Sequence, residues 1–262
     1  SRISRTGGCG IASVTQPADD EVDIFPDVNK VTGDVVFASN RGRGIFQIWS
    51  VSPGSRGLTQ LTNTPHGASY PAWSPDGKEI AYTALDKKGN EYIWIMDVNG
   101  SESRQLTLGI QPRWSPDGKS LAYSAITQSK KNKSRDVYTI EIATNIISQI
   151  TSEETAEFSP DWSPDGKWIV YVAYKGKIKF LKDGKEAVRD LKSKPNYEVW
   201  LKNVEDAGRG GIQLTRTKGL NYLPRWSPVS GEIAFVSTRG ESHDIWLMAP
   251  GVVTASMAAP AP

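Results

Sequence analysis

The sequence contains very little cysteine and histidine and no long apolar run. Cys9 is the single cysteine among 262 residues, which excludes an intrachain disulfide. With only His66 and His243, at most a two-histidine metal site could form. No apolar stretch reaches the ~18 residues that a membrane-spanning helix needs, and no signal-peptide pattern is visible. A reactive or lipidated Cys9 stays open.

Neither sign of charge dominates, because 31 Lys and Arg stand against 29 Asp and Glu. The chain as a whole is therefore no polycation, and any basic binding surface must be local. Its length exceeds that of an average domain, but all-β domains of this size are often single units. The 24 Gly and 16 Pro indicate many tight turns.

A repeat runs through most of the chain. The sequence Trp-Ser-Pro-Asp-Gly-Lys occurs at 73–78, 114–119 and 162–167, and a degenerate copy begins at Trp226. A proline lies two residues before each tryptophan, at Pro71, Pro112, Pro160 and Pro224. Pro26 marks a fifth copy, in which Val28 takes the place of the tryptophan. Internal repeats of about 40 residues are typical of propellers and other repeat architectures.

Each copy predicts a four-stranded antiparallel meander, whose strands we name A to D. Ser-Pro-Asp-Gly is turn chemistry and joins strand A to strand B as a tight hairpin. Strand C carries an aliphatic–aromatic pair such as Ile93-Trp94, and strand D ends in Gln-Leu-Thr or Gln-Ile-Thr. One such sheet cannot bury both of its faces alone, so stacking around an axis is predicted, with the tryptophans packed between neighbouring sheets.

The predicted fold is therefore all-β, a five-bladed β-propeller spanning residues 1–250. The repeat units cover about 22–66, 67–109, 110–153, 154–217 and 218–250, and 251–262 is a flexible tail. The last unit lacks its own strand D. We expect residues 9–16, with Ser13-Val14-Thr15, to complete it and close the ring. A C-terminal strand near 252–256 is the alternative.

The unit at residues 71–107 combines Pro-x-Trp-Ser-Pro-Asp-Gly-Lys-x-Ile-Ala-Tyr, Ile-Trp-x-Met-Asp and Arg-Gln-Leu-Thr. It resembles the repeat of the TolB-type (WD-like) β-propeller family, and the resemblance extends over about 9–250. The resemblance implies a bacterial protein, periplasmic or extracellular, that binds other proteins. The family also includes propeller domains of serine peptidases and polysaccharide lyases. TolB itself has an additional α/β domain and six blades, whereas this sequence shows five copies.

Catalytic motifs are not visible in the sequence. The Gly-x-Ser-x-Gly elbow of serine hydrolases and a phosphate-binding Gly-rich loop before a helix are both missing. We therefore predict no catalytic residue, no metal and no cofactor. The residue after the strand A proline is Asp27, Ala72, Arg113, Asp161 or Arg225. This ring predicts ion pairs between neighbouring blades near the axis. A polar ligand pocket and an acid–base pair of Asp27 and Asp161 are alternatives.

Three of the loops between strands B and C are basic. Those at 40–46, 126–135 and 174–195 carry formal charges of +2, +4 and +5, which leaves −9 for the rest of the chain. A hairpin turn at Asp183-Gly184 predicts a β-finger in the longest of them. We expect a basic face that attracts a protein or another anionic ligand. Nucleic acid is disfavoured because no aromatic residue interrupts the lysines of the loop at 126–135.

The sequence thus predicts a non-enzymatic binding propeller with its ligand over the basic face and the channel mouth. A carbohydrate-active hydrolase or lyase with its site at the channel mouth is the alternative. The oligomeric state is not indicated. The candidate ligand-binding residues are Tyr70, Arg113, Asp161, Tyr222 and Arg225 near the axis, with Lys130, Lys131, Lys133 and Arg135 in one basic loop.

Overall fold

The computed structural model describes most of the repeat region. The described residues are Thr15, 17–55, 57–128, 133–153, 155–174, 179–180, 186–187, 196–206, 210–240 and 242–250. Every regular element among them is a β-strand, which confirms the all-β prediction. In this part of the chain no helix is long and apolar enough to cross a membrane.

The strands form five antiparallel units in chain order. Unit 1 consists of β1 (Asp23–Val28), β2 (Val35–Ser39), β3 (Gln47–Val51) and β4 (Leu58–Gln60). Unit 2 consists of β5 (Ala68–Trp73), β6 (Glu79–Leu85), β7 (Glu91–Asp97) and β8 (Arg104–Leu108). Unit 3 consists of β9 (Ile110–Trp114), β10 (Ser120–Gln128), β11 (Lys133–Glu141) and β12 (Ile147–Gln149). Unit 4 consists of β13 (Ala156–Trp162), β14 (Trp168–Tyr174), β17 (Tyr197–Asn203) and β18 (Ile212–Gln213). Unit 5 has three described strands, β19 (Asn221–Trp226), β20 (Ile233–Ser237) and β21 (Asp244–Met248).

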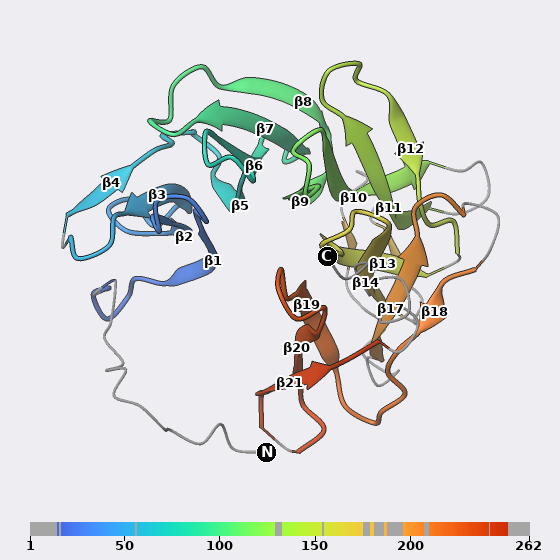
Figure 1. Ribbon diagram of the computed structural model, residues 1–262. Coiled ribbons are helices and arrows are strands. Elements are labelled where there is room, and N and C mark those ends of the chain that lie inside the picture. The colour runs from blue at the N-terminus through green and yellow to red at the C-terminus, as the bar shows by residue number, and fades with distance from the viewer. Residues whose placement is uncertain are drawn as a thin grey trace, which may run out of the picture.

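The five units stand around a common axis with their A strands innermost (Figure 1). The A strands are β1, β5, β9, β13 and β19. Units 3 and 4 are joined by a single parallel bridge between Arg135 and Ala156. The described ribbons leave the ring open between unit 1 and unit 5, so ring closure and the blade count of the whole chain stay predictions.

The turn between strands A and B forms as its chemistry predicts. In unit 2 the Gly77 N–H donates to Ser74 O at 2.9 Å, and Gly77 has a φ of +72°, which glycine adopts without strain. The Ser74 hydroxyl donates to Asp76 Oδ1 at 2.7 Å and accepts the Glu79 N–H at 2.9 Å. The turn therefore satisfies its own polar groups and fixes where strand B begins.

Every strand A contains a β-bulge at its proline. The residue before the proline has a positive φ in each unit, at Phe25, Tyr70, Gln111, Ser159 and Leu223. The pairing of strands A and B shifts register at the same place in all five units. Proline is tolerated here because strand A is the inner edge of its sheet, where no ladder partner needs its N–H. A bulge re-aims the side chains beside it, which here are those nearest the axis.

The Gln-x-Thr triplet at the end of strand D forms two hydrogen bonds, one to strand C and one within the triplet. In unit 1 the Thr62 hydroxyl accepts the Ile48 N–H at 2.8 Å, and Gln60 Nε2 donates to Thr62 O at 2.6 Å. Units 3 and 4 repeat this arrangement with Thr151 and Thr215. The triplet therefore attaches strand D to strand C at the position where the chain leaves for the next unit.

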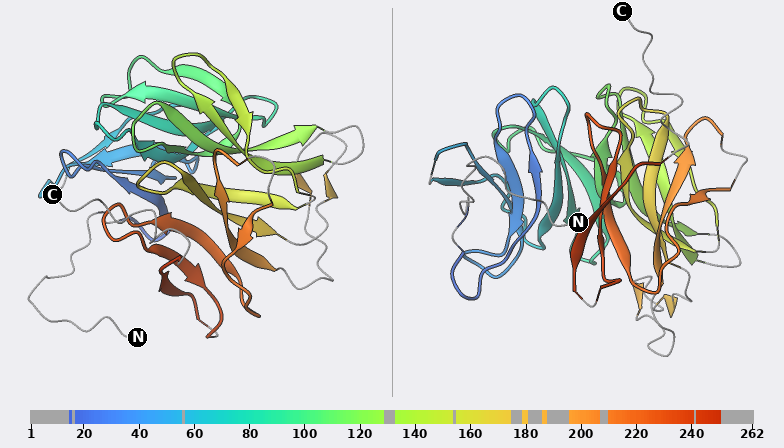
Figure 2. Two further views of the ribbon diagram at one scale, coloured as in Figure 1. Left: turned by 45° about the vertical axis from the view of Figure 1, so that its right-hand side comes forward. Right: turned by 60° about the horizontal axis from the view of Figure 1, so that its bottom comes forward.

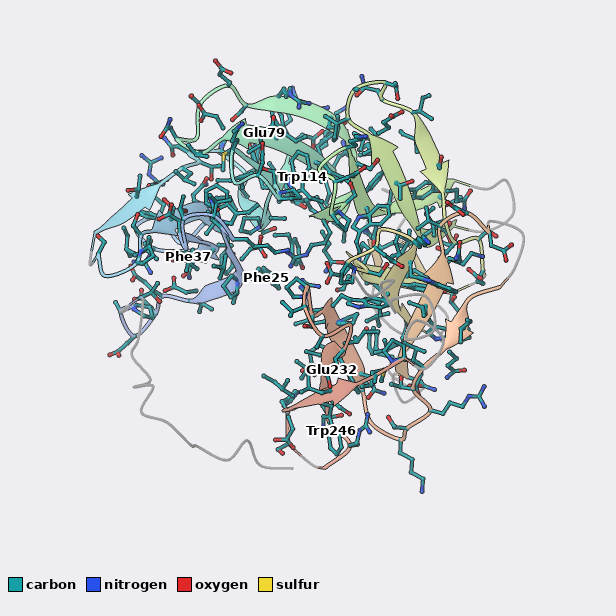
Figure 3. All side chains as sticks on the ribbon, viewed as in Figure 1. Phe25, Phe37, Glu79, Trp114, Glu232 and Trp246 are labelled. Carbon is teal, nitrogen blue, oxygen red and sulfur yellow. The ribbon has the colours of Figure 1, made fainter. Side chains whose placement is uncertain are left out.

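The hydrophobic core lies between neighbouring units, as the repeat predicts. Four clusters of buried side chains join units 1 and 2, 2 and 3, 3 and 4, and 4 and 5. Trp73, Trp114 and Trp226 are 6–8% exposed within these clusters. Trp246 is the exception, since it is 37% exposed at the outer side of unit 5 (Figure 3). No described cluster joins units 5 and 1.

Candidate functional site

A polar cavity lies at the end of the axis where the A–B turns meet. Its volume is about 290 Å³. It is lined by the last residues of the A strands and the prolines of the following turns: Asp27, Val28, Lys30, Ala72, Trp73, Ser74, Pro75, Arg113, Trp114, Pro116, Asp161, Trp162, Pro164, Arg225, Trp226 and Pro228. The structure thus brings together the charged ring that the repeat register predicted.

Asp27 joins three units at this cavity. Its Oδ2 accepts the Trp73 N–H of unit 2 at 2.7 Å, and its Oδ1 accepts from Arg113 Nη1 of unit 3 at 3.1 Å. Arg113 reaches across unit 2 because the intervening residue is Ala72, whose small side chain is 1% exposed. The Asp27–Arg113 pair therefore joins units 1 and 3, which are not neighbours in the ring.

Asp161 and Arg225 do not form the predicted ion pair. Asp161 Oδ2 accepts the Trp226 N–H at 2.7 Å, and Arg225 Nη1 donates to the carbonyl of Pro224 at 2.8 Å. The prediction of ion pairs between neighbouring units is therefore wrong for the described residues. None forms between Arg113 and Asp161, Asp161 and Arg225, or Arg225 and Asp27. Both aspartates are instead bonded by the backbone N–H of the next unit's tryptophan.

The tryptophans form hydrogen bonds in one of two ways, which the sequence did not reveal. Where the preceding unit carries no Asp, the indole donates to its backbone: Trp114 Nε1 to Ala72 O and Trp162 Nε1 to Arg113 O, both at 3.1 Å. Where an Asp precedes, the Asp takes the backbone N–H. The indole Nε1 atoms of Trp73 and Trp226 then have no hydrogen-bond partner in the described part of the chain.

The cavity geometry favours recognition over acid–base chemistry. Each aspartate directs a carboxylate oxygen at a backbone donor, and Asp27 also bonds a guanidinium. Oxygens that are occupied in this way are not turned toward a substrate, as a general acid or base must be. Charged groups in a concave, partly enclosed site instead give orientation and specificity to a bound group.

Two of the predicted axis residues do not line this cavity. Tyr70 is the bulge residue of β5 and packs on Phe25, with ring centroids 4.1 Å apart; Figure 3 labels Phe25 on the side of unit 1 that faces the axis. Tyr222 lies one residue earlier in its strand than Tyr70 does and meets the edge of His243, with centroids 6.2 Å apart. The two tyrosines therefore do not occupy equivalent positions.

Two arginines of the predicted basic face are largely buried in the structure. Arg135 is 3% exposed, donates to Glu91 at 3.1 Å and lies over the Phe158 ring. The side chain of Arg41 is 11% exposed and pairs with Asp23 at 2.7 Å. The prediction that Arg135 is an exposed loop residue is wrong, because β11 begins earlier than the sequence pattern suggested and places Arg135 within the sheet.

The other residues of that loop fall largely outside the described part. Lys130 and Lys131 lie outside it, and Lys133 is described only as the first residue of β11. In the long insertion, β15 (Lys179–Phe180) pairs with β16 (Glu186–Ala187), which confirms the central part of the predicted hairpin.

This hairpin projects from the end of the molecule that carries the B–C loops (Figure 2). The axial cavity lies at the opposite end, because strand A runs from one face to the other. The basic loops and the cavity therefore do not form one surface.

No metal site is formed by the residues that the structure describes. They contain no group of three or more His, Cys, Asp or Glu side chains that could hold an ion. His66 is exposed in its loop, and His243 packs against Tyr222.

A buried pair of carboxyl groups between units 3 and 4 was missed by the sequence analysis. Asp136 and Glu157 are 1% and 0% exposed. Burial raises the pKa of Glu157 to about 9. The hydrogen bond from Thr155 opposes this rise, and the nearby Asp136 adds to it. Between units 4 and 5, the same positions hold Glu198 and Asn221, and the Asn221 amide donates to Glu198 at 3.1 Å. Aligning the repeats at these two positions would have revealed the pair.

Comparisons with known proteins agree with this architecture. No protein-family model matches the chain. A segment of 56 residues is 32% identical to the Tol-Pal system protein TolB of Nitratidesulfovibrio vulgaris, and covers 21% of this chain but only 13% of that protein. A structure assigned as TolB of Agrobacterium tumefaciens has a TM-score of 0.68 at 21% identity over 88% of this chain and 78% of its own. TolB of Acinetobacter baumannii has a TM-score of 0.67 at 21% identity over 87% of this chain and 52% of its own.

The repeated four-stranded units around one axis, with a polar cavity at its end, define a β-propeller. More particularly, its fold resembles that of the TolB propellers, which agrees with the resemblance carried by the Trp-Ser-Pro-Asp-Gly repeat.

Proposed function

We propose that this chain is a non-enzymatic binding propeller that holds a protein or another anionic ligand over the axial cavity. The observation that carries the proposal is the convergence of Asp27, Arg113, Asp161 and Arg225 on one cavity at the end of the axis. The carboxylates there are engaged by donors of the propeller itself, which supports binding more than turnover.

The basic loops are a second surface of the same proposal. Arg43 is exposed in the first of them, and Lys130, Lys131 and Lys133 belong to the third. These loops lie at the opposite end of the strands from the cavity, so they would contact a different part of a ligand or a second ligand. Their role is to attract acidic partners at long range, which salt weakens.

We propose a location in the bacterial periplasm. The support is the TolB-type fold and the curated relative, whose name places it in the Tol-Pal system. The match spans only about an eighth of that relative, so its partners are not carried over to this chain.

The proposal is tested by measuring binding of the purified chain to a panel of purified bacterial periplasmic proteins, acidic glycans and anionic vesicles by biolayer interferometry. The double variant Arg113→Gln/Arg225→Gln is measured beside the wild type, and Arg216→Gln serves as the control because Arg216 is exposed and lies outside the cavity. We expect a protein of the panel to bind the wild type and the control, and to bind the double variant at least ~10-fold more weakly, a loss of ~1.4 kcal/mol.

Two results would contradict the proposal. One is the absence of binding to every member of the panel. The other is hydrolysis or cleavage of a glycan by the wild type that Asp161→Asn abolishes while the protein stays folded, which would establish the carbohydrate-active alternative.

A further inference from the structure

Arg225 is an arginine of the axial cavity that forms no described ion pair. Its one described hydrogen bond goes to the carbonyl of Pro224, and no described carboxylate oxygen lies within 4.0 Å of its guanidinium. Arg113, the other arginine of the cavity, is paired with Asp27 at 3.1 Å. Arg113 therefore stabilises the fold, whereas Arg225 remains available to a ligand.

Burial makes this availability costly. Burial, followed by the charge of Arg113, lowers the pKa of Arg225 to about 10, while the more distant charges of Asp161 and Asp27 oppose the shift. The side chain therefore still carries its charge at neutral pH. A largely buried charge that no carboxylate contacts directly destabilises the folded protein. A ligand that supplies the counter-ion removes this destabilisation. The free energy released in this way strengthens binding of the ligand.

The charge of the cavity indicates which anion fits. Lys30, Arg113 and Arg225 stand against Asp27 and Asp161, which gives a formal charge of +1. A monoanion neutralises the cavity. A dianionic phosphate would leave an excess negative charge between the two carboxylates. A planar guanidinium also matches the two oxygens of a carboxylate in a bidentate geometry.

We propose that the axial cavity binds one carboxylate of a protein ligand on Arg225, either the C-terminal carboxylate of a peptide or the side chain of an Asp or Glu. The inference rests on the proposed function and names the ligand group for that site. The volume of about 290 Å³ is that of roughly ten liquid waters, which is enough for one acidic residue and too small for a folded domain.

The test uses four small probes and the indole N–H signals of the 15N-labelled protein. N-acetylglycine carries a C-terminal carboxylate, and N-acetylaspartic acid amide carries a side-chain carboxylate. N-acetylglycine amide has no charge, and inorganic phosphate, at a pH above its second pKa, is mainly the dianion. Trp73, Trp114, Trp162 and Trp226 line the cavity, so their signals report binding there.

We expect the carboxylate probes to shift signals of the cavity tryptophans, and the amide and phosphate to leave them in place. The stronger of the two carboxylate probes identifies the source of the group. In Arg225→Gln the affinity should fall at least ~10-fold, and in Arg216→Gln it should be unchanged. Equal shifts with N-acetylglycine amide, or full affinity in Arg225→Gln, would overturn the proposal.

A second variant is used if Arg225→Gln does not fold. Loss of signal dispersion in the same spectrum would reveal that the variant is unfolded. Arg225→Lys keeps the charge but loses the bidentate geometry, so weaker carboxylate binding is expected and unchanged binding would overturn the proposal. Failure of this inference differs from failure of the proposed function. If a panel protein binds at the cavity but the carboxylate probes do not, the carboxylate inference alone fails. If the probes bind but no protein does, the binding function fails.

Discussion

Asp27 accepts hydrogen bonds from two other units, so its removal should loosen both contacts. Asp27→Ala leaves the Trp73 N–H without an acceptor and the half-buried Arg113 without a counter-ion. We expect a loss of about 2 kcal/mol in the free energy of unfolding, measured by urea denaturation. Asp27→Asn retains an acceptor for the N–H and should lose clearly less. Equal losses in the two variants would contradict the role of the Trp73 contact.

Glu157 should make the protein less stable as the pH rises. Its ordinary pKa applies in the unfolded chain and its raised pKa of about 9 in the folded protein, so between those values the folded state binds more protons. The free energy of unfolding therefore falls as the pH rises from about 5 to about 9. Glu157→Gln should flatten this dependence and be more stable than the wild type near pH 8, because an amide can donate to Asp136 as Asn221 does to Glu198. Urea denaturation of both proteins across this pH range tests it; parallel curves would contradict it.

At the residue scale, the sequence predicted which side chains would meet but not which of them would pair. The repeat register alone places Asp27, Arg113, Asp161 and Arg225 on one ring. Their pairing depends on the small size of Ala72 and on the N–H groups that engage the aspartates, which are properties of the packed structure. Arg135 was misplaced because nothing in its local pattern marks where β11 begins.

At the element scale, the bulge in each strand A has a consequence for stability. Ser159 has a φ of +52° and is 6% exposed. A residue with a Cβ is disfavoured in this region by about 1–2 kcal/mol, and glycine is not. We therefore expect Ser159→Gly to be about 1 kcal/mol more stable than Ser159→Ala in thermal or urea denaturation.

Ser124 provides the matched control for that comparison. It is buried in the middle of β10, its φ is not positive, and its hydroxyl has no hydrogen-bond partner in the described structure. There the order should reverse, with Ser124→Ala more stable than Ser124→Gly. The same order at both sites would contradict the bulge explanation.

The strands and turns were predictable because their signals are local. Ser-Pro-Asp-Gly specifies a hairpin, and the aliphatic–aromatic pairs specify strand C. The bulge was not predicted, although the regular prolines in strand A were its signal. A proline in a strand requires either an edge position or a bulge, and these strands have both.

At the scale of the whole molecule, the open side of unit 5 predicts a strand partner. Ile245 and Leu247 of β21 are 76% and 62% exposed, and no described strand D covers them. A side-chain hydrogen bond joins Thr15 to Asp23, much as Thr151 meets Glu157 at the start of unit 4. We propose that residues 9–16 pair with β21, as the repeat register predicts, so that Thr15 takes the role of the triplet threonine.

Truncation tests this closure. Removing residues 1–16 should lower the free energy of unfolding by roughly 3 kcal/mol, because two large aliphatic side chains lose their cover. Removing residues 251–262 should leave it nearly unchanged. The reverse result in denaturation experiments would show that the C-terminal segment completes unit 5 instead.

The central claim is that the ligand is held at the axial end of the A–B turns, and hydrogen–deuterium exchange tests it most directly. The panel protein that binds would be added to the chain and the protected peptides identified by mass spectrometry. The account predicts slower exchange in the A–B turns that surround the cavity, at 74–78, 115–119 and 163–167. Protection confined to the B–C loops at 40–46 and 86–90, with unchanged exchange in the turns, would contradict it.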